Sequence, residues 1–331
     1  MRIESSITSI SWIPSEAIPG LIKLPFEIGL GHYDEPPGDR LPGSIPELAA
    51  SGEIRFANDL RAYIDVEDGK IVASGHTGQG WIGVTRVAFG PRKLNFPAIP
   101  LPDIRPEVSA TGNSVRFVQT TGGRVAFPLP RKVARPPFVQ ITPPLVWTTL
   151  ALTLHADGRV EREVTGASPF PRHWIYDGEG VLIKKSGTTD FKTWSAEIFG
   201  VKTPWGAEDS PAIVTEVETA LERELSKTIM RGGAKPKVRS IEAGQNLVAQ
   251  GEQGNELFLL LDGVLSVEVD GKALAEIGPG AILGERALLE GGTRTATLRA
   301  VTRCRVAVAT ADQVAPEALA EVAKGHRREE Q

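Results

Sequence analysis

The stretch Gly284–Thr297, GERALLEGGTRTAT, holds the pair of residues best suited to chemistry, a glutamate and an arginine nine positions apart. A guanidinium forms charge-assisted hydrogen bonds with phosphate or carboxylate groups, and a carboxylate accepts hydrogen bonds from hydroxyl groups. Many residues around Glu285 and Arg294 are small, which lets the backbone approach a bound molecule closely. These residue types can hold an anion that also carries hydroxyl groups, provided that the fold brings them together.

Elsewhere the residues that could do chemistry form two short clusters beside proline-rich segments. They are His32, Tyr33 and Asp34 in GHYDEPP, and Arg172, His173 and Trp174 in SPFPRHW. Each cluster combines a titratable group with an aromatic ring, which suits the mouth of a pocket in a barrel. The alternative, which we favour, is that they anchor loops or are partly buried structural residues. The chain has no HExxH, GxSxG or phosphate-loop motif, and no metal is expected.

Composition places the chain among ordinary globular proteins, with 331 residues, 41% hydrophobic and 24% charged. The formal net charge of -4 predicts no general attraction to nucleic acid or to anionic membranes, although a local basic patch is compatible with that average. No apolar run of signal-peptide length opens the chain, and none approaches the ~20 residues that a membrane helix needs. We therefore expect a cytoplasmic protein with no membrane contact.

The single cysteine, Cys304, excludes an internal disulfide and a thiolate metal cluster. It alternates with Arg303 and Arg305, which predicts a buried thiol on one face of a strand.

Two modules are predicted from an abrupt change in composition. Of the 25 prolines, 21 lie at or before Pro204, and all six tryptophans and three tyrosines lie at or before Trp205. We expect a β-rich domain at residues 1–205, a connecting helix at 206–233 and a second domain at 234–331.

The connecting helix is predicted from its ends and its apolar periodicity. Ser210 and Pro211 form a start signal, and Gly232 and Gly233 form a stop. The apolar residues between them, spaced by three and four positions, are Val214, Val217, Leu221, Leu225 and Ile229. This stripe is expected to pack on a domain core, and the seam of a homodimer is the alternative.

The first module contains hairpin signals between alternating segments. They are Asp68-Gly69, Gly122-Gly123, Asp157-Gly158 and Asp177-Gly178. One short helix is predicted at residues 45–50. The predicted fold class is mainly β, an antiparallel β-barrel or sandwich with long proline-rich loops.

The second module has Asp262-Gly263 and Asp270-Gly271 turns and a glycine at almost every strand junction, which predicts a small β-roll or jelly roll. Residues 236–312 closely resemble the cyclic nucleotide-binding domain family. The resemblance rests on glycine, glutamate, alanine and leucine, then an arginine nine residues after the glutamate, two small residues and a threonine.

The resemblance implies a role for each residue of the opening stretch. Glu285, at the start of a single-turn helix, holds the ribose 2′-hydroxyl, and Arg294 neutralises the phosphate. The amides of Ala287 and Thr295 add donors. The implied ligand-binding set is Gly284, Glu285, Arg286, Ala287, Leu288, Arg294, Thr295 and Ala296.

Some residues depart from the commonest family pattern, but none of the departures removes a ligand contact. Leu283 replaces a usual phenylalanine, Arg286 a smaller residue and Thr293 a frequent proline. Thr295 also occurs in kinases of the cyclic-GMP type, but bacterial cyclic-AMP receptors carry Ser or Thr at the same position. The expected ligand is cAMP, with cGMP as the alternative.

After Val308 the chain has room for a short helix near 316–323 and a charged tail, but not for a helix-turn-helix. Direct DNA binding is therefore not expected, and an unidentified protein partner is. The leading hypothesis is a regulatory protein whose C-terminal β-roll controls the β-rich domain. The alternatives are an enzyme gated by the nucleotide and acting on a small molecule through the first domain, and a scaffold whose β-roll binds nothing small.

Overall fold

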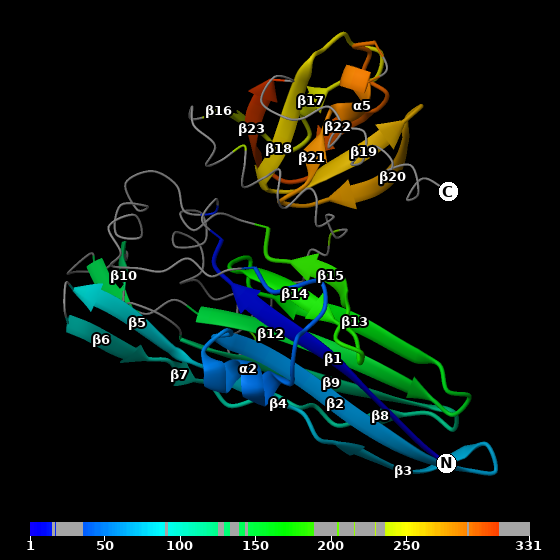
Figure 1. Cartoon of the computed structure of the whole chain (residues 1–331). Coiled ribbons are helices and arrows are strands. Elements are labelled where there is room, and N and C mark those ends of the chain that lie inside the picture. Colours follow the sequence, from blue (N-terminus) through cyan, green and yellow to red (C-terminus); the bar gives the residue numbers. More distant parts are fainter. Residues whose placement is uncertain are drawn as a thin grey trace. The chain divides into compact units, whose positions relative to one another are not determined.

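The computed structural model of the chain describes residues 1–14, 36–89, 92–124, 129–132, 139–142, 145–188, 236–289 and 291–310, with Ala17, Pro204, Thr215 and Ile229. The chain divides into two compact units, Met1–Val214 and Thr215–Gln331 (Figure 1). The division falls within the predicted connecting helix, of which only Thr215 and Ile229 are among the described residues.

The first unit contains a six-stranded antiparallel sheet in the order β15-β14-β1-β2-β3, with β4 also paired to β2. Its strands are β1 (Arg2–Trp12), β2 (Phe56–Glu67), β3 (Lys70–His76), β4 (Gln79–Ile82), β14 (Arg172–Tyr176) and β15 (Leu182–Ser186). A second sheet of five antiparallel strands has the order β13-β12-β9-β7, with β8 also paired to β9. Its strands are β7 (Ile99–Pro100), β8 (Ser109–Ala110), β9 (Ser114–Arg124), β12 (Leu145–His155) and β13 (Val160–Ala167).

Alternating apolar residues of both sheets share one core, as expected for two sheets packed face to face. The buried residues of this core are Ile7, Leu60, Ala62, Ile64, Val66, Val115, Phe117, Leu150, Leu152, Leu154 and Ile175. Within the part of this unit that the structure describes, the sheets are open at their edges and form no closed barrel. The mainly β, antiparallel prediction is therefore confirmed in its sandwich form.

The interior becomes polar toward one end of the sandwich. Asn58 in β2 donates from Nδ2 to the carbonyl oxygen of Thr148 at 2.9 Å, and Gln119 Nε2 donates to Asn58 Oδ1 at 2.8 Å. All three side chains are fully buried. Hydrogen bonds between the sheets thus replace apolar packing at this end.

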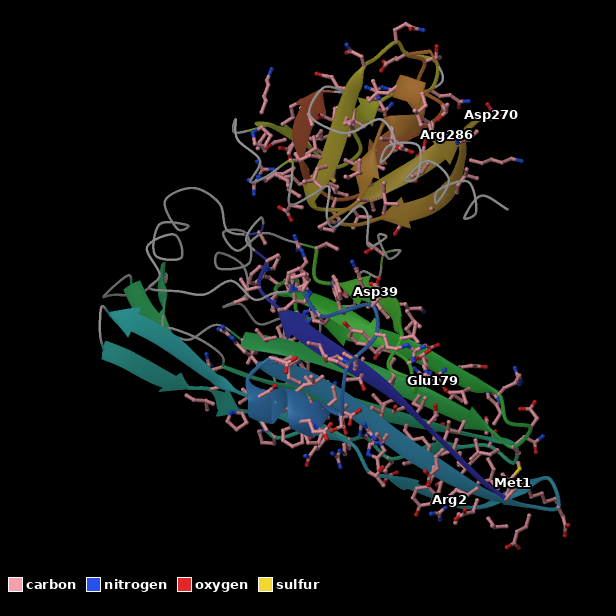
Figure 2. The ribbon with its side chains drawn as sticks, viewed as in Figure 1. Met1, Arg2, Asp39, Glu179, Asp270 and Arg286 are labelled. Carbon is pink, nitrogen blue, oxygen red and sulfur yellow. The ribbon has the colours of Figure 1, made fainter. Side chains whose placement is uncertain are left out.

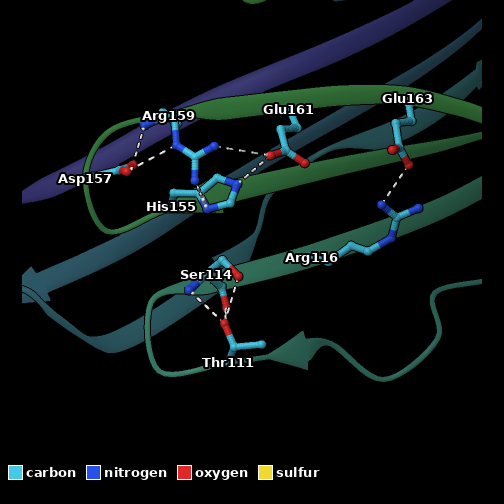
Figure 3. A network of polar contacts seen from close by, with 8 residues as sticks. All are labelled: Thr111, Ser114, Arg116, His155, Asp157, Arg159, Glu161 and Glu163. Carbon is cyan, nitrogen blue, oxygen red and sulfur yellow. Dashed lines mark hydrogen bonds and ion pairs between the residues drawn. The ribbon is translucent and has the colours of Figure 1, made fainter.

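The opposite end of β12 carries charged groups at the surface (Figure 3). Arg159 Nε lies 3.1 Å from Asp157 Oδ2, and His155 Nε2 lies 3.0 Å from Glu161 Oε1. Exposed ion pairs of this kind contribute little to stability.

The glycine-containing turns correct one prediction. Asp68 and Gly69 have positive φ values, 48° and 74°, and connect β2 to β3 as predicted. Gly122 and Gly123, also predicted as a turn, instead lie inside β9, so that prediction is wrong. A Cβ on Gly123 would lie 2.5 Å from the carbonyl oxygen of Ile99, so glycine is needed there for close strand packing.

The described residues of the first unit also form one helix and two ribbons. Helix α2 (Ile45–Ser51) lies where a helix was predicted, and Glu47 accepts bonds from both the amide and the hydroxyl of Ser44. The two-stranded ribbons are β5 (Val84–Phe89) with β6 (Arg92–Pro97), and β10 (Leu129–Lys132) with β11 (Val139–Thr142).

The second unit is a β-roll of two four-stranded antiparallel sheets, β16-β23-β18-β21 and β17-β22-β19-β20. Its elements are β16 (Lys237–Ile241), β17 (Asn246–Val248), β18 (Glu256–Asp262), β19 (Leu265–Val269), β20 (Lys272–Ile277), β21 (Ile282–Leu283), α5 (Glu285–Leu289), β22 (Thr297–Ala300) and β23 (Cys304–Thr310). Cys304 is fully buried, as predicted, and burial raises the pKa of its thiol to about 11.

Candidate functional site

The backbone that carries Arg294 is fixed by the loop Gln250–Gly254, which lies about forty residues earlier in the chain. The amide of Gly251 donates to the carbonyl of Arg294, and the amide of Arg294 donates to the carbonyl of Glu252, both at 2.8 Å. Gln253 Nε2 donates to Thr293 Oγ1, also at 2.8 Å. These bonds hold the arginine in one register against the loop.

The guanidinium of Arg294 is directed into the β-roll, since the residue is only 4% exposed. Its Nη1 donates to the carbonyl oxygen of Glu256 at 3.0 Å and lies 3.5 Å from that of Gly284. The Phe258 ring centroid lies 5.1 Å from Cζ, within the range of a cation–π contact. Among the described residues, no carboxylate forms an ion pair with Arg294. Neutral groups therefore hold a buried cation in place.

Burial lowers the pKa of the Arg294 guanidinium, and the nearby carboxylates of Glu256, Glu252 and Glu285 act in the opposite direction. An arginine stays protonated at neutral pH even so. The site thus keeps its positive charge. An anion that binds there would contact a guanidinium that folding has already partly desolvated.

Two glycines make room for the guanidinium. Gly284 has a φ of 88°, and a Cβ there would lie 2.5 Å from Arg294 Nη1 and 2.8 Å from the carbonyl oxygen of Glu256. A Cβ on Gly254 would lie 2.6 Å from Nη2. Any larger residue at either position must displace the arginine or the backbone.

Helix α5 supplies the other predicted residues. Glu285 begins the helix and is 3% exposed, and the carbonyl of Ala287 accepts a bond from the amide of Gly292 at 2.6 Å. Arg286, which Figure 2 labels on the β-roll, and Leu288 are half-buried. Thr295 and Ala296 are half-buried as well and follow Arg294 directly.

The structure brings Gly284 beside Arg294, with 3.5 Å between the Gly284 carbonyl oxygen and Arg294 Nη1, and Glu285 follows Gly284 directly in the chain. Sequence reasoning missed the loop Gln250–Gly254, the carbonyl of Glu256 and the ring of Phe258. Glycines at 251 and 254 just before an apolar strand were the available signal for the loop.

The two N-terminal clusters are placed differently. His32, Tyr33 and Asp34 lie outside the described residues. His173 is fully buried, with Nδ1 2.6 Å from Ser11 Oγ and Nε2 2.8 Å from the carbonyl oxygen of Ser168. Because that carbonyl can only accept, Nε2 carries the proton and Nδ1 accepts from the Ser11 hydroxyl.

Arg172 and Trp174 are also buried. Arg172 Nη1 donates to the carbonyl of Gly187 at 2.7 Å, and Trp174 forms an edge contact with Trp12 at a centroid distance of 5.2 Å. This geometry favours the structural interpretation of the cluster over the mouth of a pocket.

We expect the buried His173 to make folding sensitive to acid. Burial lowers its pKa from 6.5 to about 4, so between these values the unfolded chain binds the proton and the folded chain does not. The stability of the first unit should therefore fall as the pH drops through this window, by up to about 3 kcal/mol from this residue. Urea unfolding followed by tryptophan fluorescence at pH 7.5 and pH 4.5 measures the loss.

The matched variant is His173→Gln, which should be less stable than wild type at pH 7.5 but should lose less stability on acidification. Equal losses in the two proteins would show that the imidazole is not the group responsible.

Within the part of the chain that the structure describes, no helix is long and apolar enough to cross a membrane. In the same residues, no group of three or more His, Cys, Asp or Glu side chains is arranged to hold a metal ion.

Comparison with known proteins shows which family the second unit is similar to. Residues 238–317 match the family described as "Cyclic nucleotide-binding domain". The cGMP-dependent protein kinase egl-4 of Caenorhabditis briggsae is 40% identical over 60 residues, which are 18% of this chain and 8% of the kinase. The cyclic nucleotide-gated potassium channel mll3241 of Mesorhizobium japonicum is 33% identical over 92 residues, 28% of this chain and 21% of the channel.

A solved cyclic nucleotide-binding domain from Methylobacillus flagellatus is similar with 22% identity and a TM-score of 0.28, over 33% of this chain and 78% of that chain. The chain spans less than a quarter of the length of the kinase and of the channel. Such a domain implies cAMP or cGMP as its ligand. The C-terminal part of this chain, residues 238–317, is thus a member of the cyclic nucleotide-binding domain family.

Proposed function

We propose that this chain is a regulatory protein in which a cyclic nucleotide bound to the C-terminal β-roll controls the N-terminal sandwich. The observation that carries the proposal is the buried guanidinium of Arg294, which is held by carbonyl oxygens and is not neutralised by an ion pair with a described carboxylate. A cyclic phosphodiester is a singly charged anion of a size that one guanidinium can match.

Each residue then has a defined role. Arg294 binds the phosphate, Glu285 accepts the ribose 2′-hydroxyl, and the amides of Ala287 and Thr295 donate to phosphate oxygens. Gly284 supplies the turn that only glycine adopts without strain, at a φ of 88°.

The proposed ligand is cAMP, and cGMP is the alternative. Thr295 follows the arginine directly, where its hydroxyl could bridge the phosphate and the amino group of guanine. The names of the related kinases, which are cGMP-dependent, support the alternative. The ratio of the two dissociation constants decides between them.

To control the first unit, a structural change caused by ligand binding must be transmitted from the β-roll through packed residues. Leu288 of α5 packs against an apolar cluster that includes Leu257, Leu259 and Ile282, and Ile229 is buried in the same cluster. Ile229 belongs to the predicted stripe of the connecting helix. A shift of α5 on binding would therefore act on the segment that leads to the first unit.

Hydrogen–deuterium exchange of the full chain with and without saturating cAMP tests this coupling. We expect slower exchange in residues 250–254 and 284–297, where the ligand binds, together with a change in residues 1–205. Protection confined to the β-roll would leave nucleotide binding intact but reject control of the sandwich.

A further inference from the structure

The loop Gln250–Gly254, which fixes the backbone of Arg294, also contacts the tip of the β19–β20 hairpin. The tip is the two-residue turn Asp270-Gly271, and Figure 2 labels Asp270 on the β-roll. The side chain of Gln250 forms two hydrogen bonds with Asp270. Its Nε2 donates to Asp270 Oδ1 at 3.1 Å, and its Oε1 accepts from the backbone amide of Asp270 at 2.9 Å. One glutamine thus joins the loop to the hairpin.

The chemistry of the two bonds fixes the orientation of the Gln250 side chain. A backbone amide can only donate, so the oxygen of the glutamine must face the amide of Asp270, and its NH₂ group then faces the carboxylate. Asp270 has a φ of 50°, the conformation of a tight hairpin turn, which aspartate and asparagine tolerate. The tip therefore offers Gln250 one donor and one acceptor from a residue that the turn itself favours.

The backbone of the same loop is bonded to the segment that carries the phosphate site. The amide of Gln250 donates to Thr297 Oγ1 at 2.9 Å. The amide of the next residue, Gly251, donates to the carbonyl oxygen of Arg294 at 2.8 Å. The hairpin tip and Arg294 are thus bonded to adjacent residues of one loop, and a shift of either one acts on the other through Gln250.

The other end of strand β20 contacts Thr215, the first residue of the second unit, which lies within the predicted connecting helix. Gly278 directly follows β20, and a Cβ on Gly278 would lie 2.3 Å from Thr215 Oγ1. Thr215 is only 5% exposed. Strand β20 therefore leads from the tip that Gln250 holds to a buried residue of the predicted connecting helix.

We propose that Gln250 is a positioning residue of the nucleotide site, which couples the phosphate contact at Arg294 to the β19–β20 hairpin. Gln250 acts through the loop that fixes Arg294 and needs no contact with the ligand. Its role rests on the proposed function, because it concerns the same site. Coupling of this kind is reciprocal: if the bonds to Asp270 strengthen nucleotide binding, bound nucleotide strengthens the bonds to Asp270 by the same factor.

Displacement of fluorescent cAMP and cGMP analogues from the full chain, measured by polarisation, tests the role of Gln250. Gln250→Ala should weaken binding by about three- to tenfold, because the loop loses two bonds that hold it in register. The control is Gln245→Ala, which removes another exposed glutamine of the β-roll, whose Oε1 accepts from the amide of Glu242 at 3.3 Å. It should bind within about twofold of wild type.

Substitutions of Asp270 test the other side of the pair. Asp270→Asn keeps an acceptor oxygen and tolerates the positive φ, so its affinity should stay within about twofold of wild type. Asp270→Gly permits the same φ but removes the acceptor, and should weaken binding by about threefold. The double variant Gln250→Ala with Asp270→Gly should bind no more than about twofold more weakly than Gln250→Ala alone. Effects that multiply would show that the two residues act independently and would overturn the proposal.

Hydrogen–deuterium exchange at saturating cAMP tests the reciprocal effect, which a residue that only stabilises the fold would not produce. In wild type, cAMP should slow exchange in residues 269–272, where the amide of Asp270 is bonded to Gln250, and should change exchange around Thr215. Both responses should be smaller in Gln250→Ala at saturation. An equal response of the tip in the two proteins would overturn the coupling, and an equal response at Thr215 would contradict its transmission through β20.

The binding results separate a failure of this proposal from a failure of the proposed function. If wild type binds neither analogue, the proposed function is overturned and the role of Gln250 with it. If wild type binds and Gln250→Ala binds within about twofold of it, nucleotide binding stands and the positioning role is overturned. A loss in Gln245→Ala as large as that in Gln250→Ala would also overturn the positioning role, because the effect would not depend on the contact with Asp270.

Discussion

Arg294→Ala is expected to weaken cyclic nucleotide binding by roughly 30-fold to several thousand-fold, equivalent to about 2–5 kcal/mol. The substitution removes the partner of the phosphate from a site where Arg294 is 4% exposed and is held by the carbonyl of Glu256. Displacement of a fluorescent cAMP analogue, measured by polarisation, gives the affinity of each variant.

The control for this substitution is Arg299→Ala in β22 of the same β-roll. Arg299 is exposed and pairs with Glu268, with 2.9 Å between Nε and Oε1. Its loss should leave the affinity within about twofold of wild type, because exposed ion pairs contribute little. Glu285→Ala should fall between the two, since it removes an acceptor for a neutral hydroxyl. Equal affinities for wild type and Arg294→Ala would contradict the assignment of the phosphate site.

Gly284→Ala should damage both the fold of the β-roll and its affinity. The positive φ of 88° costs an alanine about 1–2 kcal/mol. In addition, the new Cβ would lie 2.5 Å from Arg294 Nη1 and 2.8 Å from the backbone oxygen of Glu256. We expect an unfolding midpoint lower by several degrees and an affinity at least tenfold weaker.

Gly244→Ala separates these two effects, because Gly244 has a matching φ of 84° but nothing within 4 Å of an added Cβ. It should lower the unfolding midpoint without changing nucleotide affinity. If the two variants bind equally well, close approach to the guanidinium is not what requires glycine at position 284.

Much of the architecture could be predicted because it depends on local patterns. The Asp68-Gly69 and Asp270-Gly271 turns adopt positive φ at both residues, which few other residue pairs tolerate, and hairpins follow. The Gly122-Gly123 pair also predicted a turn, but glycine is needed at Gly123 because Ile99 approaches the backbone of β9 closely. A glycine pair alone does not distinguish a turn from a close strand contact.

The residues proposed to bind the ligand could be named from the sequence, but the residues that hold Arg294 in place could not. Glu285 and Arg294 lie close in the sequence, and their spacing is specific. The loop Gln250–Gly254 meets Thr293 and Arg294 only after folding, and most of these contacts are made by backbone amides, which leave no side-chain signature. The burial of His173 was likewise hidden, because a histidine beside prolines suits a loop as well as a sandwich interior.

The measurement that tests the central claim most directly is isothermal titration calorimetry of the full chain with cAMP and, separately, with cGMP. We predict one ligand per chain, with cAMP the tighter of the two and the heat lost in Arg294→Ala. If neither nucleotide produces heat or competes for the site at millimolar concentration, the buried guanidinium does not bind a cyclic phosphate and the regulatory proposal is contradicted.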